Sequence, residues 1–402
     1  MPNNRLYPFI AWSIPLFFFA YQFVLRLWPS LIMHQVMENF GVDATSYGVL
    51  ASVYYYGYAV MQIPIAILLD KYAPRIIMSI CALLCGVGML ISVNTDSWIM
   101  MLLARFIIGI GSAGGFLSTS KVIAQHFSSE KYGRMISISF SIGLLGAVYG
   151  YKPTNELIQL FDLENTGKIL AAVAFLIAIL GFIILRSQKR SEAIEDLKLS
   201  DVLQVIKSPS TIALGLANLL MVGSLEGFAD VWGVNYIVAA YRVDKSSAAE
   251  IMSFIPIGMI FGGPILVLLS KYVTEYVAIF IAAIGMACSI VYILYFQETF
   301  SLVIMAFICF IIGVMCCYQV LIFTIGNSIV SKERLSLTIA FLNCINMLGG
   351  AFFHSLIGAG MDFFAGGLIT NGVYAISTYK ISLFIIPMCS VIGGIITLCL
   401  RK

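Results

Sequence analysis

Residues Trp98–Gln125 read WIMMLLARFIIGIGSAGGFLSTSKVIAQ, a 28-residue apolar run with only two charges, Arg105 and Lys121. A helix needs roughly 20 apolar residues to cross the hydrocarbon core of a bilayer, so this stretch predicts a membrane-spanning helix. It also contains Gly109-Ile-Gly111-Ser-Ala-Gly114, a literal match to the G-x-G-x-x-G dinucleotide fingerprint. No β-α-β pattern surrounds the match, so we interpret these glycines as close helix contacts and not as a cofactor site.

The rest of the chain has the same apolar character. Of its 402 residues, 60% are hydrophobic and 11% are charged, whereas soluble domains are about one quarter charged. The composition therefore excludes a water-soluble globule, and the net charge of +3 gives no reason to expect a nucleic-acid partner. All nine cysteines lie in apolar runs and behave as small hydrophobes. We expect no metal, no cofactor, no catalytic residues and no enzyme activity, because neither a metal-ligand spacing nor a nucleophile–base set is present.

Apolar windows of spanning length recur twelve times. They are continuous and do not alternate strictly, which favours helices over a β-barrel. The expected fold is an all-α polytopic membrane protein with twelve transmembrane helices. The polar stretch 187–210 separates two blocks of six, so we predict a bundle at 1–186, a cytoplasmic linker at 187–210 and a bundle at 211–402. The expected spans are 8–33, 46–69, 75–94, 98–125, 133–152, 168–186, 211–240, 246–269, 275–296, 300–328, 335–359 and 381–400.

The positions of the basic residues predict the orientation. With the N-terminus inside, 15 of the 23 lysines and arginines fall on the inner side and 5 on the outer side. Cytoplasmic loops carry the excess of basic residues in membrane proteins. Both termini and the central linker are therefore expected in the cytoplasm, and the inner membrane of a bacterium is the expected location.

The two blocks resemble each other internally. Pro64–Tyr72 (PIAILLDKY) has a counterpart 200 residues later at Pro264–Tyr272 (PILVLLSKY), and Ala104–Ala113 (ARFIIGIGSA) corresponds to 308–317 (ICFIIGVMCC). Repeats in the same order predict two pseudo-symmetric six-helix bundles in parallel orientation.

These features make the chain similar to the major facilitator superfamily of secondary transporters. LLDKYAPR (68–75) resembles the superfamily's signature after the second span, although Ala66, Ala73 and Pro74 depart from it. Arg105 and Gly109 match its R-x-x-x-G motif. LEGFADVWG (225–233) and FLNCINMLGGAF (341–352) resemble a bacterial branch of organic-anion or phagosomal nutrient transporters. The resemblance implies the major facilitator fold and a transport activity, and it names no cargo.

A cytoplasmic gate is expected where the signature lies. Charged residues at the ends of spans can pair with neighbouring helix ends and hold one gate closed. The alternative is that the basic members only fix the topology. The candidates are Asp70, Lys71, Arg75, Glu130 and Arg134.

Charges inside spans are costly, roughly 2.5–3.5 kcal/mol each at mid-helix, and mark functional candidates. Arg26 and Arg105 are each about seven residues from the outer ends of their spans, about 10 Å deep at a rise of 1.5 Å per residue. Two guanidiniums at one level can bind a carboxylate bidentately. The alternatives are snorkelling of Arg26 and a structural role for Arg105. Lys121 lies near the cytoplasmic end of its span. Two interpretations stay open: it binds cargo in a central cavity, or it snorkels to the membrane surface or forms a structural pair.

Glu226 and Asp230 are spaced i, i+4 on the seventh span and share a face. Two desolvated acids this close take up protons near neutral pH, which is what proton-coupled transport needs. The alternative is a buried ion pair that only fixes packing. Weaker candidates for cargo contacts, with helix packing as the alternative for each, are Gln22, Tyr54, Tyr58, Gln62, Asn343 and Asn346.

The sequence as a whole favours proton-coupled uptake of a small organic anion or zwitterion, such as an amino acid, by alternating access. The expected partners are a carboxylate-bearing small molecule, protons and the lipid bilayer, and the expected state is a monomer. Two alternatives stay open. One is an exporter of drugs, metabolites or siderophore-like carboxylates, and the other is a membrane receptor that binds ligand without transporting it.

Overall fold

The computed structural model describes residues 6–186, 207–296, 301–329, 335–366 and 374–401. The predicted linker lies outside these residues except for 207–210, and the side chain of Asp70 is also outside them. Within the described residues, twelve helical segments are long and apolar enough to cross a membrane. The twelve predicted spans and the all-α fold class are thereby confirmed.

Several helices run beyond the predicted ends of their spans. Helix α1 (Tyr7–Phe40) continues past position 33, α16 (Leu335–Ala365) continues past 359, and α7 (Lys152–Ile184) begins sixteen residues before position 168. Polar residues such as Glu38 closed the apolar windows, but they do not stop a helix, because its hydrogen bonds lie within its own backbone. Asp162 interrupts α7 with φ 64° and ψ 176°, and its carboxylate accepts from the Asn165 N–H at 2.8 Å.

The described chain forms two compact units. Unit 1 comprises Met1–Trp28 and Val53–Ala193, and unit 2 comprises Pro29–Ser52 and Ile194–Lys402. Helices α1 and α2 (Ala44–Lys71) are therefore divided between the units, since their joined ends belong to unit 2.

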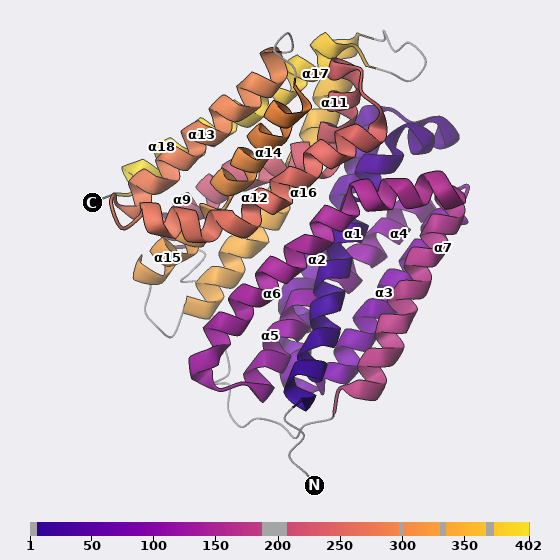
Figure 1. Cartoon of the computed structure of the whole chain (residues 1–402), viewed down its shortest axis with the longest axis vertical. Helices are drawn as coiled ribbons and strands as arrows, with labels where there is room; N and C mark the ends of the chain where they lie inside the picture. The colour runs from indigo at the N-terminus through magenta and orange to yellow at the C-terminus, as the bar shows by residue number, and fades with distance from the viewer. Residues whose placement is uncertain (1–5, 187–206, 297–300, 330–334, 367–373, 402) are drawn as a thin grey trace. The chain divides into compact units, whose positions relative to one another are not determined.

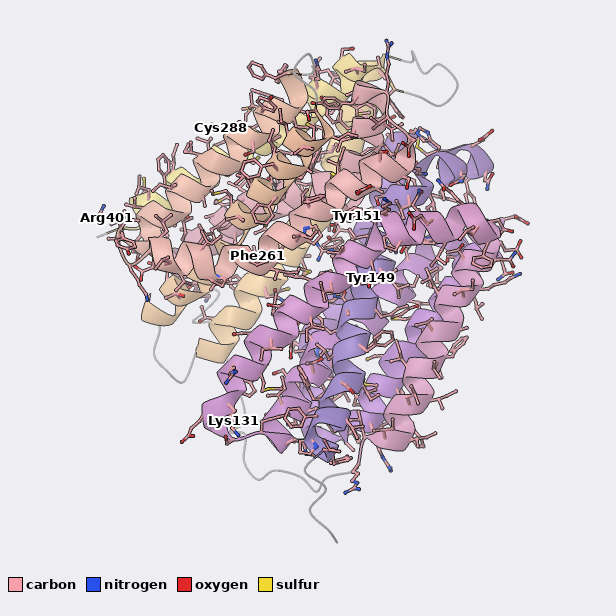
Figure 2. The ribbon with its side chains drawn as sticks, in the orientation of Figure 1. Lys131, Tyr149, Tyr151, Phe261, Cys288 and Arg401 are labelled. Carbon is pink, nitrogen blue, oxygen red and sulfur yellow. The ribbon has the colours of Figure 1, made fainter. Side chains whose placement is uncertain are left out.

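Unit 1 contains the first parts of the repeat. Helix α3 (Pro74–Val93) packs against both α4 (Trp98–Ser112) and α7 (Figure 1). Lys131 lies near the start of α6 (Ser129–Gly150), and Tyr151 directly follows its end (Figure 2). Besides its portions of α1 and α2, the unit has α3 (Pro74–Val93), α4 (Trp98–Ser112), α5 (Gly114–His126), α6 (Ser129–Gly150) and α7 (Lys152–Ile184).

Unit 2 contains the remaining spans. Its seventh span is built from five helical pieces, two of them π-helical. Helix α13 (Glu275–Tyr295) packs along α18 (Ile385–Cys399) (Figure 1). The elements are α9 (Pro209–Asn218), η1 (Leu219–Gly223), α10 (Ser224–Gly227), η2 (Phe228–Trp232), α11 (Gly233–Tyr241), α12 (Lys245–Leu269), α13 (Glu275–Tyr295), α14 (Leu302–Cys316), α15 (Gln319–Ile329), α16 (Leu335–Ala365), α17 (Ile376–Leu383) and α18 (Ile385–Cys399).

The internal repeat is visible in how glycines bring helices together. A Cβ built on Gly109 of α4 would lie 2.1 Å from the carbonyl oxygen of Tyr54 on α2. In unit 2, a Cβ on Gly313 of α14 would lie 1.9 Å from the carbonyl oxygen of Ile255 on α12. Only glycine permits backbones this close. Each unit therefore contains the same tight crossing at the positions that the sequence repeat aligns.

Candidate functional site

The first group of candidate residues surrounds Arg26 in unit 1. The Arg26 Cζ lies 4.9 Å from the centroid of the Tyr55 ring and 5.9 Å from that of Phe23. A guanidinium over an aromatic face is attracted by the ring quadrupole, while its N–H groups point outward in its own plane. The side chain of Arg26 is half-buried. This packing orients a cation inside a membrane-spanning bundle.

A second arginine lies beside the same aromatic residues. The Arg105 Cζ is 4.9 Å from the centroid of the Tyr54 ring, and the Tyr54 hydroxyl donates to Gln22 Oε1 at 2.9 Å. The rings of Tyr54 and Tyr55 lie 5.6 Å apart. The structure thus brings Gln22, Arg26, Tyr54 and Arg105 together, four of the residues that the sequence singles out for cargo.

Arg105 also has a structural partner. Its Nη1 donates to the Leu25 carbonyl oxygen at 2.8 Å, and both residues are buried. Leu25 precedes Pro29 by four residues, and proline has no N–H to donate to the carbonyl one helical turn earlier. Arg105 supplies the donor that the helix lacks there. This contact favours the structural alternative for Arg105 and leaves Arg26 as the stronger candidate for a cargo ligand.

The acidic candidates lie in an irregular part of unit 2. Glu226 is in α10, between the π-helical segments η1 and η2, and Asp230 is in η2. The exposed fractions are 8% for Glu226 and 5% for Asp230. π-Bulges inside α-helices occur frequently at functional sites. They also rotate the side chains that follow, so the common face inferred from the i, i+4 spacing does not follow from regular helix geometry here.

Two further polar side chains adjoin Glu226. His354 Nε2 lies 3.3 Å from the Glu226 carbonyl oxygen, and the His354 side chain is fully buried. Tyr318 is close enough to Glu226 for an electrostatic interaction, and within the described residues its buried hydroxyl has no hydrogen-bond partner. Buried polar groups normally have partners, including water. Glu226 therefore has two polar side chains from other spans beside it.

The other cargo candidates are more scattered. Tyr58 is buried with its ring 6.2 Å from that of Tyr54, and Gln62 is half-buried one turn further along α2. Asn346 is buried, and its Oδ1 has no hydrogen-bond partner among the described residues. Asn343 and Lys121 are half-buried, Asn343 on α16 and Lys121 on α5.

Of the predicted cytoplasmic gate, the structure describes the side chains of Lys71, Arg75, Glu130 and Arg134, and Arg75 among them contacts an aromatic ring. The Arg75 Cζ lies 5.3 Å from the centroid of the Phe182 ring. Lys71, Glu130 and Arg134 are exposed. The gate stays a prediction, with an aromatic partner for Arg75 that the sequence motif did not indicate.

The candidates chosen from the sequence include neither Tyr55 nor His354. Tyr55 is one position away from the Tyr54, Tyr58 and Gln62 stripe, and helical spacing assigned it to another face. Its contact with Arg26 depends on how α1 packs against α2. His354 was visible as a histidine inside a span, but its partner is a backbone carbonyl 128 residues away, which no pattern reveals.

Comparison with known proteins gives three kinds of match. The family model described as Major Facilitator Superfamily matches residues 12–354. The "Probable sulfoacetate transporter SauU" of Cupriavidus necator is 26% identical over 131 residues, 33% of this chain and 30% of the relative. The "Probable L-galactonate transporter" of Escherichia coli K12 is 23% identical over 256 residues, 60% of this chain and 56% of the relative. The chain thus matches less than two thirds of the length of these relatives.

The fold also matches solved structures. A crystal structure of a bacterial homologue of the human lysosomal transporter Spinster, in an inward-facing and unoccupied conformation, superimposes with a TM-score of 0.76. Its sequence identity is 16%, and the match covers 99% of this chain and 97% of the other. At this identity the match shows a common fold.

Proposed function

Because this chain belongs to the Major Facilitator Superfamily of secondary transporters, we propose that it carries a small organic anion or zwitterion across the membrane by alternating access, coupled to protons. The family and the relatives point to a transporter and not to an enzyme. Arg26 is the proposed ligand of the cargo carboxylate, and Glu226 the proposed proton site. The predicted orientation, with both termini in the cytoplasm, is part of the proposal.

The observation that carries the cargo class is the setting of Arg26. Its guanidinium is held over Tyr55 within a membrane-spanning bundle, where a charge is retained only for a functional reason or with partners. The two relatives are named for sulfoacetate and L-galactonate, and both compounds carry a carboxylate. A planar guanidinium is well suited to bind that group through two parallel hydrogen bonds.

The proton site is supported by the surroundings of Glu226. The Glu226 side chain is buried and lies beside the polar side chains of His354 and Tyr318. Protonation at one membrane face and release at the other then couples the proton to cargo movement. Asp230, four residues later and also buried, is the second candidate.

The experiment for Arg26 is uptake of radiolabelled sulfoacetate and L-galactonate by proteoliposomes, with and without an imposed pH gradient. Removal of one partner of a buried charge pair costs roughly 2–5 kcal/mol, so Arg26→Ala should lower uptake of a transported probe at least tenfold. Arg186→Ala is the matched control, because Arg186 also stacks on a tyrosine, with its Cζ 4.2 Å from the Tyr7 ring, but is exposed. Parental uptake by Arg26→Ala would remove Arg26 from the site.

Glu226→Gln tests the coupling. The variant should still exchange cargo across the membrane but should no longer accumulate it when a pH gradient is imposed. Glu250→Gln, at an exposed position of α12, is the control and should accumulate cargo normally. Gradient-driven accumulation by Glu226→Gln would contradict the assignment, while binding without accumulation by the parent protein would favour a receptor.

A further inference from the structure

The joined ends of α1 and α2 form a hairpin, Pro29–Ser52, that belongs to unit 2. It packs against α16 through small residues. A Cβ on Gly48 would lie 2.4 Å from the His354 carbonyl oxygen, and a Cβ on Gly358 would lie 2.4 Å from that of Ala44. Ser52 Oγ donates to the Ala351 carbonyl oxygen at 2.5 Å. The start of α2 therefore lies directly against the backbone of α16.

One carboxylate holds the first residues of α2. Asp362, on α16, accepts from the N–H groups of Ala44 at 3.2 Å and Thr45 at 2.6 Å. It also accepts from the Thr45 hydroxyl at 2.5 Å and from the Tyr374 hydroxyl at 2.5 Å. The first N–H groups of a helix have no partner within the helix, and negative charge is favourable at that end. Asp362 thus supplies an acceptor from more than 300 residues away in sequence.

Tyr374 completes the arrangement. Its hydroxyl also lies 3.0 Å from the Ala44 nitrogen and accepts that N–H. Burial, and to a smaller extent the hydrogen bond to Asp362, raise the pKa of Tyr374. The phenol therefore keeps its proton and donates a hydrogen bond to the carboxylate. The neighbouring charge that acts on Tyr374, besides Asp362, is Asp43.

The α1 side of the hairpin is held by three other side chains. The Tyr47 hydroxyl donates to the Pro29 carbonyl oxygen at 2.6 Å, and Asn235 Nδ2 donates to that of Ser30 at 3.2 Å. Lys245 Nζ donates to the Leu31 carbonyl oxygen. Donors from α2, α11 and α12 therefore meet three consecutive carbonyl groups directly after Trp28, the last residue of the first segment of unit 1.

The helix itself does not need Asp362 in order to begin. Asp43 already caps α2 locally, since its Oδ1 accepts from the Ser46 N–H at 2.9 Å. Asp244 makes the same local cap on α12, where its carboxylate accepts from the Ser247 N–H at 2.9 Å. What distinguishes Asp362 is that it joins two segments far apart in the chain.

We propose that Asp362 is a gating residue. Its carboxylate, held by Tyr374, fastens the Pro29–Ser52 hairpin to α16, and the strength of this fastening sets how often the hairpin leaves unit 2. This inference goes beyond the proposed function, because it concerns neither the cargo nor the proton site. It holds whichever cargo the protein carries.

The test measures docking of the hairpin directly, without cargo. Spin labels are attached at Glu38→Cys, near the end of α1, and at Ile381→Cys, on α17, after the nine native cysteines have been replaced. Both sites are exposed and lie in unit 2. Pulsed dipolar spectroscopy in nanodiscs then gives the distance distribution between the labels. Preserved helix content and a monodisperse elution profile show that each protein is folded.

Asp362→Asn should raise the ratio of undocked to docked distances roughly ten- to hundredfold, as expected for the loss of one hydrogen bond to a charged group. Tyr374→Phe and Thr45→Val should raise it less, because the carboxylate keeps its other partners. These two variants also carry the test if Asp362→Asn does not fold. Asp43→Asn and Asp244→Asn, which remove the negative charge of a local cap but keep an acceptor oxygen, should match the parent protein.

Two results would overturn the proposal. In the first, Asp362→Asn, or both milder variants, give the parental distance distribution. In the second, Asp43→Asn or Asp244→Asn shifts the distribution as much as Asp362→Asn does, which would make Asp362 an ordinary helix cap. Neither result depends on uptake by Arg26 or Glu226 variants, so failure of the gating proposal is distinguishable from failure of the proposed function.

Discussion

The contact between Arg105 and Leu25 makes a quantitative prediction about Pro29. Arg105→Met removes the donor to the Leu25 carbonyl oxygen and leaves a buried acceptor without a partner, at a cost of about 1–3 kcal/mol. It also removes the cation–π contact with Tyr54, worth about 0.5–2 kcal/mol, and relieves the cost of burying a charge. These last two effects do not involve residue 29.

Pro29→Ala changes only the first effect. Alanine at position 29 has an N–H that can donate to the Leu25 carbonyl oxygen, one turn earlier in α1. In this background Arg105→Met no longer leaves the carbonyl without a partner. The double-mutant cycle should therefore show a coupling energy of about 1–3 kcal/mol between positions 29 and 105, the value assigned to the buried acceptor.

The free energy of unfolding is measured by SDS titration in mixed micelles for the parent, both single variants and the double variant. Pro64→Ala is the control, because Pro64 also lies inside a helix, α2, but the N–H that it lacks would face the Val60 carbonyl and not the Leu25 carbonyl that Arg105 contacts. Arg105→Met and Pro64→Ala should be additive within about 0.5 kcal/mol. If positions 29 and 105 are also additive within that limit, Arg105 does not replace the N–H that proline lacks.

Three further predictions concern other parts of the chain. Gly109→Ala should destabilise the protein by at least about 1–3 kcal/mol through overpacking. Gly263→Ala, with nothing within 4 Å of the added Cβ, should be neutral or slightly stabilising. Thermal unfolding, followed by intrinsic fluorescence, compares the two variants. Hydrogen bonds from Ser247 lower the pKa of Asp244 below its ordinary value of 3.8, so the cap contributes stability above that value and loses it as the pH falls through the lowered pKa. Hydrogen exchange at the start of α12 should show this loss in the parent and not in Asp244→Asn. Tyr55→Leu should raise the KM for a transported anion about two- to thirtyfold by removing the aromatic face under Arg26, and Tyr55→Phe should not.

The large-scale organisation could be predicted because it depends on composition and period. Each of twelve apolar windows is long enough to cross a membrane as a helix. The described residues contain twelve helices of that length and composition. The repeat could be predicted for a similar reason. Gly109 and Gly313 occupy aligned positions in the sequence, and each supports the same close crossing of helices.

The features that could not be predicted depend on contacts between distant residues. Nothing in LEGFADVWG indicates that π-helical turns flank Glu226, because a π-bulge is decided by the packing of the whole span. Asp362 lay beyond the predicted end of its span at position 359, and its partners Ala44 and Thr45 are more than 300 residues away. The sequence places charges along each helix, but it does not show which backbone group each charge will meet.

The division of α1 and α2 between the two units has a consequence for biosynthesis. A fragment that ends after the sixth span would contain the Pro29–Ser52 hairpin without α16, α11 and α12. The Ala44 and Thr45 N–H groups at the start of α2, which have no partner within the helix, would lose the Asp362 carboxylate that accepts them, and the tightly packed surface around Gly48 would be uncovered. Because lipid offers no hydrogen bonds in return, the separated halves should accumulate in cells only when both are co-expressed.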